Sequence, residues 1–236
     1  MKTIVTFILL LFVLNLNAQN TKNMFSKDPI INLENWDESR LTWGYYLGFN
    51  AYDFKIDYKE DVPEILVDQT TGFNVGLVGD VRLHKHINLR FEPGLYYTQR
   101  ILNYSNPLLV RDIDKRREVN STYIHIPLLL KFSSQRTGNI RPYLLGGVST
   151  TLNLASNSKA REDNTEQRFR VNQWTNNYEL GFGIDFYTPY FKFSPSIRGL
   201  FGINDELIRD NDANSPWTSN IESLKTRAVF INFTFQ

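Results

Sequence analysis

The sequence predicts an all-β chain folded as an eight-stranded antiparallel up-and-down barrel, and three observations support this fold class. Apolar and polar residues alternate along most segments, short and long polar connections alternate between them, and an export signal stands at the N-terminus. The alternation is clearest in residues 121–152. One face of the first strand there carries Ile124, Ile126, Leu128, Leu130 and Phe132, and the other carries His125, Leu129 and Lys131. Period-two alternation of this length is typical of a strand rather than a helix.

Residues 1–18 have the features of a secretory signal peptide. Lys2 precedes an uncharged, mostly apolar run over residues 3–16, and the small Ala18 is suited to cleavage. The run is too short to span a membrane as a helix but has the length of a signal-peptide core. The chain has no cysteine, which excludes a lipid-anchored lipoprotein, a disulfide framework and a thiolate metal site. We therefore expect an exported protein that begins at Gln19.

The rest of the chain divides into a short leading segment and a barrel. Residues 19–39 are polar and mixed, so we expect an extended or loosely packed periplasmic segment there, followed by the barrel over residues 40–236. The predicted strands cover residues 41–52, 71–83, 87–101, 121–132, 140–152, 178–186, 191–201 and 228–236. Short connections fall at residues 84–86, 133–139 and 188–190, and long ones at about 53–69, 103–120, 155–172 and 203–219. This pattern is typical of outer-membrane barrels, and an even number of strands places both termini in the periplasm.

The alternating pattern alone fits either a transmembrane barrel or a soluble barrel of the lipocalin type, which would turn its apolar face inward. The export signal, the unequal connection lengths and the aromatic C-terminal strand favour the transmembrane barrel. Aromatic residues also gather at two levels, with Trp43, Tyr45, Phe132, Tyr190 and Phe235 at one and Tyr97, Trp174 and Phe201 at the other. The sequence therefore predicts an eight-stranded antiparallel up-and-down transmembrane outer-membrane β-barrel with short periplasmic turns and long extracellular loops, in contact with outer-membrane lipid and lipopolysaccharide.

If the apolar face meets lipid, the opposite face places a set of charged residues in the lumen. These residues are Arg82, Arg90, Glu92, Lys131, Arg141, Glu179, Asp185 and Arg198. The interior of an eight-stranded barrel is just wide enough to be filled by side chains, and an unpaired buried charge is costly. We therefore predict a structural network of paired charges that plugs the lumen, with inward-facing glycines making room for the long side chains.

Few residues are candidates for chemistry. His84 and His86 share a turn, but no third ligand lies near them in the sequence, and His125 faces the lumen, where a packing role is the default. The basic run Lys115–Arg117 fits a solvated loop better than a site for an anionic ligand. No nucleophile elbow or phosphate loop is present, so we expect no catalytic, cofactor-binding or metal site and no cofactor. A formal net charge of +1 argues against a nucleic-acid partner.

Several stretches together resemble the PorT/SprT family of Bacteroidota outer-membrane proteins. They are NWDESRLTWGYYLGFNAYDFKIDY at residues 35–58, INLRFEPGLYYTQRIL at 87–102, YIHIPLLLKFSSQR at 123–136 and IRPYLLGGVSTTLNLAS at 140–156. The last two also occur more loosely across the wider Bacteroidota outer-membrane barrel family. The resemblance implies a non-enzymatic component of the type IX secretion system, which exports proteins with C-terminal signal domains and in some species supports gliding motility. It implies no catalytic residues.

Three hypotheses about function follow. The first is an accessory or assembly component of type IX secretion that contacts other components of that system. The second is a structural or adhesin-like small outer-membrane barrel whose loops bind surface ligands. The third is a barrel enzyme built from loop Asp, Ser and His residues, which no sequence pattern supports. No small-molecule substrate is identified from the sequence.

Overall fold

A computed structural model describes residues 31–60, 65–107 and 109–236 of the chain. The expected signal peptide, and residues 19–30 of the expected periplasmic segment, lie outside the described residues. The strands are β1 (Leu41–Tyr58), β2 (Ile65–Gln69), β3 (Thr71–His84), β4 (Ile87–Phe91), β5 (Gly94–Tyr104), β6 (Arg116–Ser133), β7 (Ile140–Asn153), β8 (Trp174–Tyr187), β9 (Lys192–Gly202) and β10 (Ile221–Phe235). Three short helical segments accompany them: η2 (Trp36–Glu38), α2 (Asp112–Lys115) and η3 (Asn164–Glu166).

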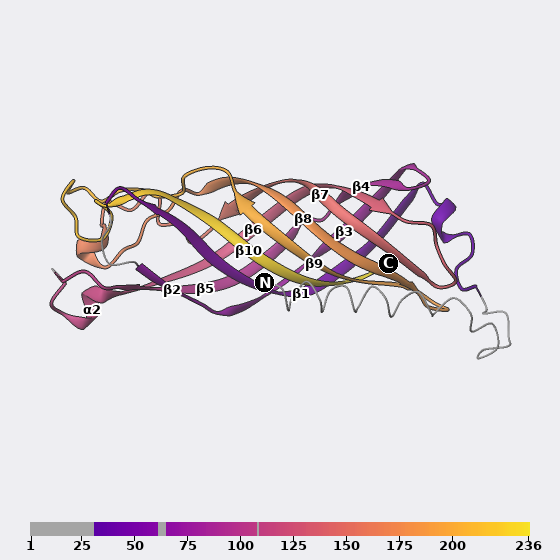
Figure 1. The fold of residues 1–236 in the computed structure, drawn as a ribbon, viewed down its shortest axis with the longest axis horizontal. Coiled ribbons are helices and arrows are strands. Elements are labelled where there is room, and N and C mark those ends of the chain that lie inside the picture. The colour runs from indigo at the N-terminus through magenta and orange to yellow at the C-terminus, as the bar shows by residue number, and fades with distance from the viewer. Residues whose placement is uncertain (1–30, 61–64, 108) are drawn as a thin grey trace, which may run out of the picture. The chain divides into compact units, whose positions relative to one another are not determined.

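These strands form a closed antiparallel sheet with eight staves, where a stave is either one strand or two strands that follow each other in line around the ring. β2 and β3 together form one stave interrupted at Thr70, and β4 and β5 form another interrupted at Glu92 and Pro93. Each stave pairs with its neighbours in the sequence, and β1 closes the ring by pairing with both β3 and β10. The strands wind obliquely around a common axis (Figure 1). The predicted eight-stranded antiparallel up-and-down barrel is confirmed.

No helix in the part of the chain that the structure describes is both long and apolar enough to cross a membrane.

The connections at one end of the barrel are short and those at the other are longer, and we call these the turn end and the loop end. The turns cover residues 85–86, 134–139 and 188–191, and the loops after β7 and β9 cover 154–173 and 203–220, close to the predicted bounds. The predicted loops at 53–69 and 103–120 are too long. β1 continues to Tyr58 and β2 begins at Ile65, while β5 ends at Tyr104 and β6 begins at Arg116.

These two loops were overestimated because the polarity of the two strand faces reverses near the loop end, although the period of two continues. Along most of β1 the outward residues are apolar and the inward ones polar or aromatic, but beyond Tyr52 the apolar Phe54 faces inward and the charged Asp53 and Lys55 do not. Arg227 on β10 forms an ion pair with Asp53 on this outer surface, Nε to Oδ2 2.6 Å. The apolar outer band therefore ends below this level, and the staves continue beyond it as water-exposed strands with an apolar interior.

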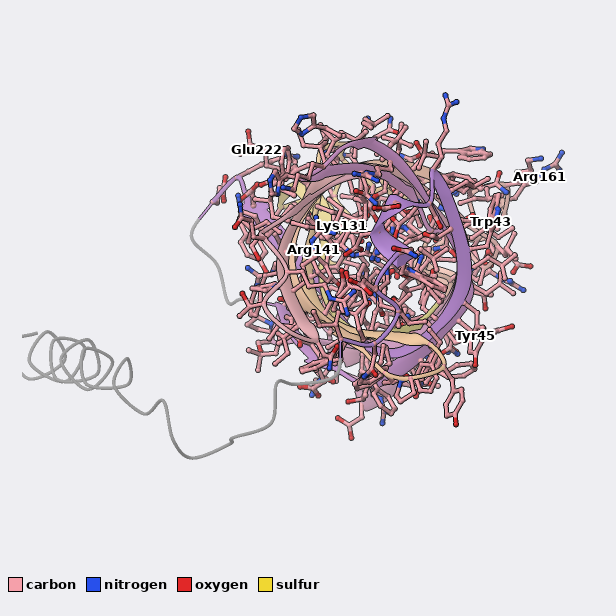
Figure 2. The ribbon with its side chains drawn as sticks, turned by 90° about the vertical axis from the view of Figure 1, so that its right-hand side faces the viewer. Trp43, Tyr45, Lys131, Arg141, Arg161 and Glu222 are labelled. Carbon is pink, nitrogen blue, oxygen red and sulfur yellow. The ribbon has the colours of Figure 1, made fainter. Side chains whose placement is uncertain are left out.

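The outer surface below this level is a belt of exposed apolar side chains. Trp43 and Tyr45 point away from the ring, whereas Lys131 and Arg141 lie inside it (Figure 2). Exposed fractions of 66% for Trp43 and 61% for Leu144 show that large apolar groups stand on the outside of the strands. The aromatic residues expected at one level flank the turn end, where Tyr45 stacks on Phe235 with ring centroids 5.4 Å apart. Of those expected at the other level, Trp174 begins β8 and Phe201 lies at the loop end of β9.

Candidate functional site

The barrel interior contains a chain of buried ion pairs that crosses from one side of the ring to the other. Arg90 on β4 donates from Nε and Nη2 to both carboxylate oxygens of Asp80 on β3, at 2.7 Å each, and from Nη1 to Glu92 at 3.1 Å. Arg198 on β9 binds the other oxygen of Glu92 at 2.7 Å. Nearly all of these side-chain atoms are removed from solvent. A bidentate arginine–carboxylate pair of this kind is among the strongest polar contacts in proteins.

Arg198 continues the chain of ion pairs toward Glu179 on β8. Its Nε lies 2.9 Å from Oε2 of Glu179, and Oε1 of Glu179 lies 2.8 Å from Nε2 of His125 on β6. The other ring nitrogen of His125 contacts Thr151 Oγ1 at 3.0 Å. Arg198 therefore sits between two carboxylates, and each of them has a second partner.

A second buried pair lies closer to the turn end. Lys131 on β6 donates to both oxygens of Asp185 on β8, at 2.9 and 2.7 Å, and Ser194 donates to Oδ1 of the same carboxylate at 2.6 Å. The Lys131 ammonium also lies 4.0 Å from the centre of the Tyr143 ring. This arrangement satisfies a lysine that is almost completely shielded from solvent.

Seven of the eight predicted lumen residues are buried inside the ring: Arg90, Glu92, Lys131, Arg141, Glu179, Asp185 and Arg198. Arg141 lies at the turn end, where its Nη1 is 3.0 Å from Asp37. Arg82 differs, because it is only half-buried and forms no ion pair with any described residue. It lies close to the turn end of β3, where the ring opens to solvent.

Two members of this network, Asp80 and His125, were not predicted from the sequence. Asp80 faces inward in the strand pattern but was not included among the lumen charges, although it holds Arg90 and accepts from Gln236 Nε2 at 3.1 Å. His125 was assigned a packing role, whereas it contacts Glu179 directly. The signal for Asp80 was available, because it shares its strand face with Arg82.

Two glycines make room for an interior tyrosine. A Cβ at Gly94 would lie 2.1 Å from the Tyr46 hydroxyl, and one at Gly76 would lie 2.6 Å from it. The hydroxyl donates to the backbone carbonyl of Glu92 at 3.2 Å, so the ring holds the strand where β4 ends. Any larger residue at these two positions would push Tyr46 out of its place.

The turn end is covered by residues 32–38, which we call the strap. Tyr187 donates to Asp37 at 2.7 Å, and Arg141 binds the same carboxylate. Arg136 donates to the backbone carbonyls of Asn32 and Leu33 and lies over the Tyr187 ring. None of these residues is fully buried, but their carbonyl and carboxylate groups bind cations of the barrel, so polar contacts hold the strap on the turn end.

The loop end is covered by a hydrophobic core, which we call the loop cap. It unites inward-facing residues at the ends of the strands with residues of three loops: Phe54, Leu102, Tyr104, Leu109, Val119, Phe169, Val171, Leu207, Trp217, Ile221 and Leu224. Trp217 donates from its indole to the carbonyl of Asp114 at 2.9 Å, which fixes the last loop onto the segment between β5 and β6. The loops therefore pack on one another and on the strand ends.

Polar contacts fix the loop cap from above. Asp210 accepts hydrogen bonds from Asn164, Ser215 and Thr218, and so joins the loops after β7 and β9. Burial opposes the ionisation of Asp163, but hydrogen bonds from Thr165 and from the Asn211 amide hold its pKa below its usual value. Arrangements of this kind keep loops in a single conformation.

The structure also places the remaining sequence candidates, the histidine turn and the basic run. The rings of His84 and His86 are 6.2 Å apart at their centres, and no group of three metal-ligating side chains is found in the described part of the chain. The run Lys115–Arg117 is not a simple solvated loop. Arg117 begins the inward face of β6 and donates to the carbonyls of Ile113 and Asn164.

The sequence of residues 17–207 matches the family model described as outer membrane protein beta-barrel domain. The chain belongs to this family. Membership agrees with the closed ring and the apolar belt, and it places the protein in the outer membrane. No curated protein is similar enough in sequence to count as a relative.

Several solved structures of small outer-membrane barrels are similar to this chain. OprG from Pseudomonas aeruginosa has 17% identity and a TM-score of 0.46, covering 82% of this chain and 94% of its own. Neisserial surface protein A has 12% identity and a TM-score of 0.40, with coverage of 80% and 95%. AlkL, solved in lipid bilayers, has 12% identity and a TM-score of 0.42, with coverage of 91% and 96%. Likeness at this level does not extend to function.

Replacing Arg198 with methionine should destabilise the barrel by about 3–5 kcal/mol, because it leaves Glu92 and Glu179 buried without their shared cation. The free energy of unfolding is measured by urea titration in liposomes. Arg198→Lys keeps the positive charge, so its free energy of unfolding should fall by less than that of Arg198→Met. Adding Glu92→Gln and Glu179→Gln to Arg198→Met should recover part of the loss. An Arg198→Met barrel within about 1 kcal/mol of wild type would show that the network contributes little.

Proposed function

We propose that the protein is a closed, non-enzymatic outer-membrane barrel that acts through contacts at its two ends rather than by conducting solutes. The observation that carries this proposal is the filling of the barrel along its whole axis. The strap lies at one end, paired arginine and carboxylate groups fill the middle, and the loop cap lies at the other end. This organisation fits a structural or adhesin-like small barrel, in which the lumen serves stability and the surfaces make contacts.

The loop cap offers a defined surface for such contacts. Val110 and Ile113, next to and within α2, are 84% and 55% exposed, so apolar side chains stand at the tip of an otherwise packed cap. Exposed apolar groups on a rigid support favour protein partners or surface ligands. In the proposed orientation this cap is extracellular, and the turns, the strap and both termini are periplasmic.

The closed lumen predicts no steady ion conductance. The purified protein in planar lipid bilayers should give only background current, because large side chains occupy the lumen. Arg90, Arg198, Lys131 and Tyr96 are each at most 2% exposed. Single-channel recording is the measurement, and a large open porin reconstituted in the same bilayers serves as the positive control. Stable channels of large conductance would contradict the proposal.

The proposed orientation predicts which residues can be reached from outside the cell. The chain has no cysteine, so single-cysteine variants are specific probes. Asn214→Cys in the last loop should react with a membrane-impermeant maleimide on intact cells. Gln135→Cys in the turn after β6 should react only after the outer membrane is permeabilised. The reverse result would invert the orientation.

A second candidate function is a role in type IX secretion. It is favoured by the resemblance of residues 35–58, 87–102, 123–136 and 140–156 to the PorT/SprT family. These stretches form most of β1 and β4–β7 with the turn between β6 and β7. In this role the barrel contacts other components of the system through its loops, its turns or the strap.

Deletion of the gene tests this second role. Proteins with C-terminal signal domains should accumulate in the periplasm and decrease in the medium, and a plasmid copy should restore export. The amounts in both fractions are measured by quantitative mass spectrometry. Normal export in the deletion strain would remove the secretion role and leave the closed surface barrel.

A further inference from the structure

Two recesses share a border at the turn end of the barrel. One is an apolar groove of about 610 Å³ on the outer surface of β6, β7 and β8. The other is a polar recess of about 380 Å³ beside the strap. His86 and Ser134 line both of them, so the groove on the wall continues into the polar recess.

The groove arises from the register of three neighbouring strands. Pro142 on β7 pairs with Ile184 on β8, and the next outward residue, Leu144, pairs with Phe132 on β6 and Phe182 on β8. The proline ring is smaller than the side chains of these neighbours, and all of them line the groove. Because this surface lies in the lipid-facing belt of an outer-membrane barrel, a hydrocarbon chain is the group that covers it.

The polar recess contains charges of both signs that the protein does not neutralise. Arg141 pairs with Asp37, and Arg136 is used by carbonyl groups of the strap. Arg82 and Lys85 form no ion pair with any residue in the described ranges, and the same is true of Glu34 and Glu38 on the strap. Two cations and two carboxylates thus lie unpaired around one recess at the mouth of an apolar groove.

We propose that this composite site binds one phospholipid whose headgroup has a phosphate and a primary ammonium, as in phosphatidylethanolamine. An acyl chain lies in the groove over Pro142. The phosphate lies near Arg82 and Lys85, and the ammonium lies near Glu34 and Glu38. This inference goes beyond the proposed function and depends on it only for the leaflet, because turns in the periplasm face the phospholipid leaflet. The cysteine labelling above tests that orientation independently.

The first test is native mass spectrometry of the full protein in detergent with phosphatidylethanolamine, phosphatidylglycerol or phosphatidylcholine of identical acyl chains. Wild type should retain one phosphatidylethanolamine in preference to the other two. Replacing Arg82 and Lys85 with alanine should weaken retention of phosphatidylethanolamine and phosphatidylglycerol roughly tenfold. Replacing Glu34 and Glu38 with glutamine should reverse the preference toward phosphatidylglycerol, because only the ammonium site is removed.

The groove is tested separately from the headgroup. Pro142→Trp places a bulky ring in the lining of the groove and should weaken retention of all three lipids, and Ser134→Trp, where the groove meets the polar recess, should do the same. Ile231→Trp is the matched control, because it places the same side chain on the outer surface of β10, away from the groove. Each variant is first checked for folding by its heat-dependent migration in gels. Retention that is equal in all variants, or equally reduced by Ile231→Trp, would overturn the proposal and indicate ordinary surrounding lipid.

Discussion

The narrow lumen of an eight-stranded barrel is the constraint on which the rest of this structure depends. Such an interior must be filled by side chains, and an outward apolar belt leaves mainly polar residues to fill it. Charges in so confined a space must be paired, and Arg198 meets this need by joining Glu92 to Glu179 across the ring. The small inward residues follow from the same constraint, because Gly76 and Gly94 leave the space that Tyr46 occupies.

The reversal of polarity along the strands explains why the protein has two interiors. Inside the membrane belt the lumen is charged, but above Tyr52 the surroundings of the strands are aqueous and the interior becomes apolar. Arg100 lies near this boundary, where its guanidinium covers the Phe54 ring of the loop cap and donates to Tyr123 of the interior. The loop cap is thus a small soluble-type core built on strands that a membrane core holds in register.

The sequence predicted the ring well because strand parity is a local property. Alternation assigned Arg90, Glu179 and Arg198 to the inward face, but it contains no information about which side chains meet across the ring. The pairing of Arg90 with Asp80 depends on the register of β3 with β4, which only the folded sheet defines. The strand ends were misread for a related reason. Charged Asp53 and Lys55 look like a loop when polarity is assumed constant, although the period of two continues through them.

The two ends of the barrel are closed by different interactions, apolar packing at the loop end and polar contacts at the turn end, and this difference suits them to different roles. The loop cap is an apolar core whose surface exposes Val110 and Ile113, the side chains to which the proposed role assigns contacts. The strap is held mainly by polar contacts, through Asp37 with Tyr187 and Arg141. Contacts of that kind respond to nearby charge, and the unpaired Arg82 and Lys85 lie beside them. A lipid phosphate bound there would be held by the same end of the barrel that anchors the strap, so lipid binding and strap position would be coupled through neighbouring charges.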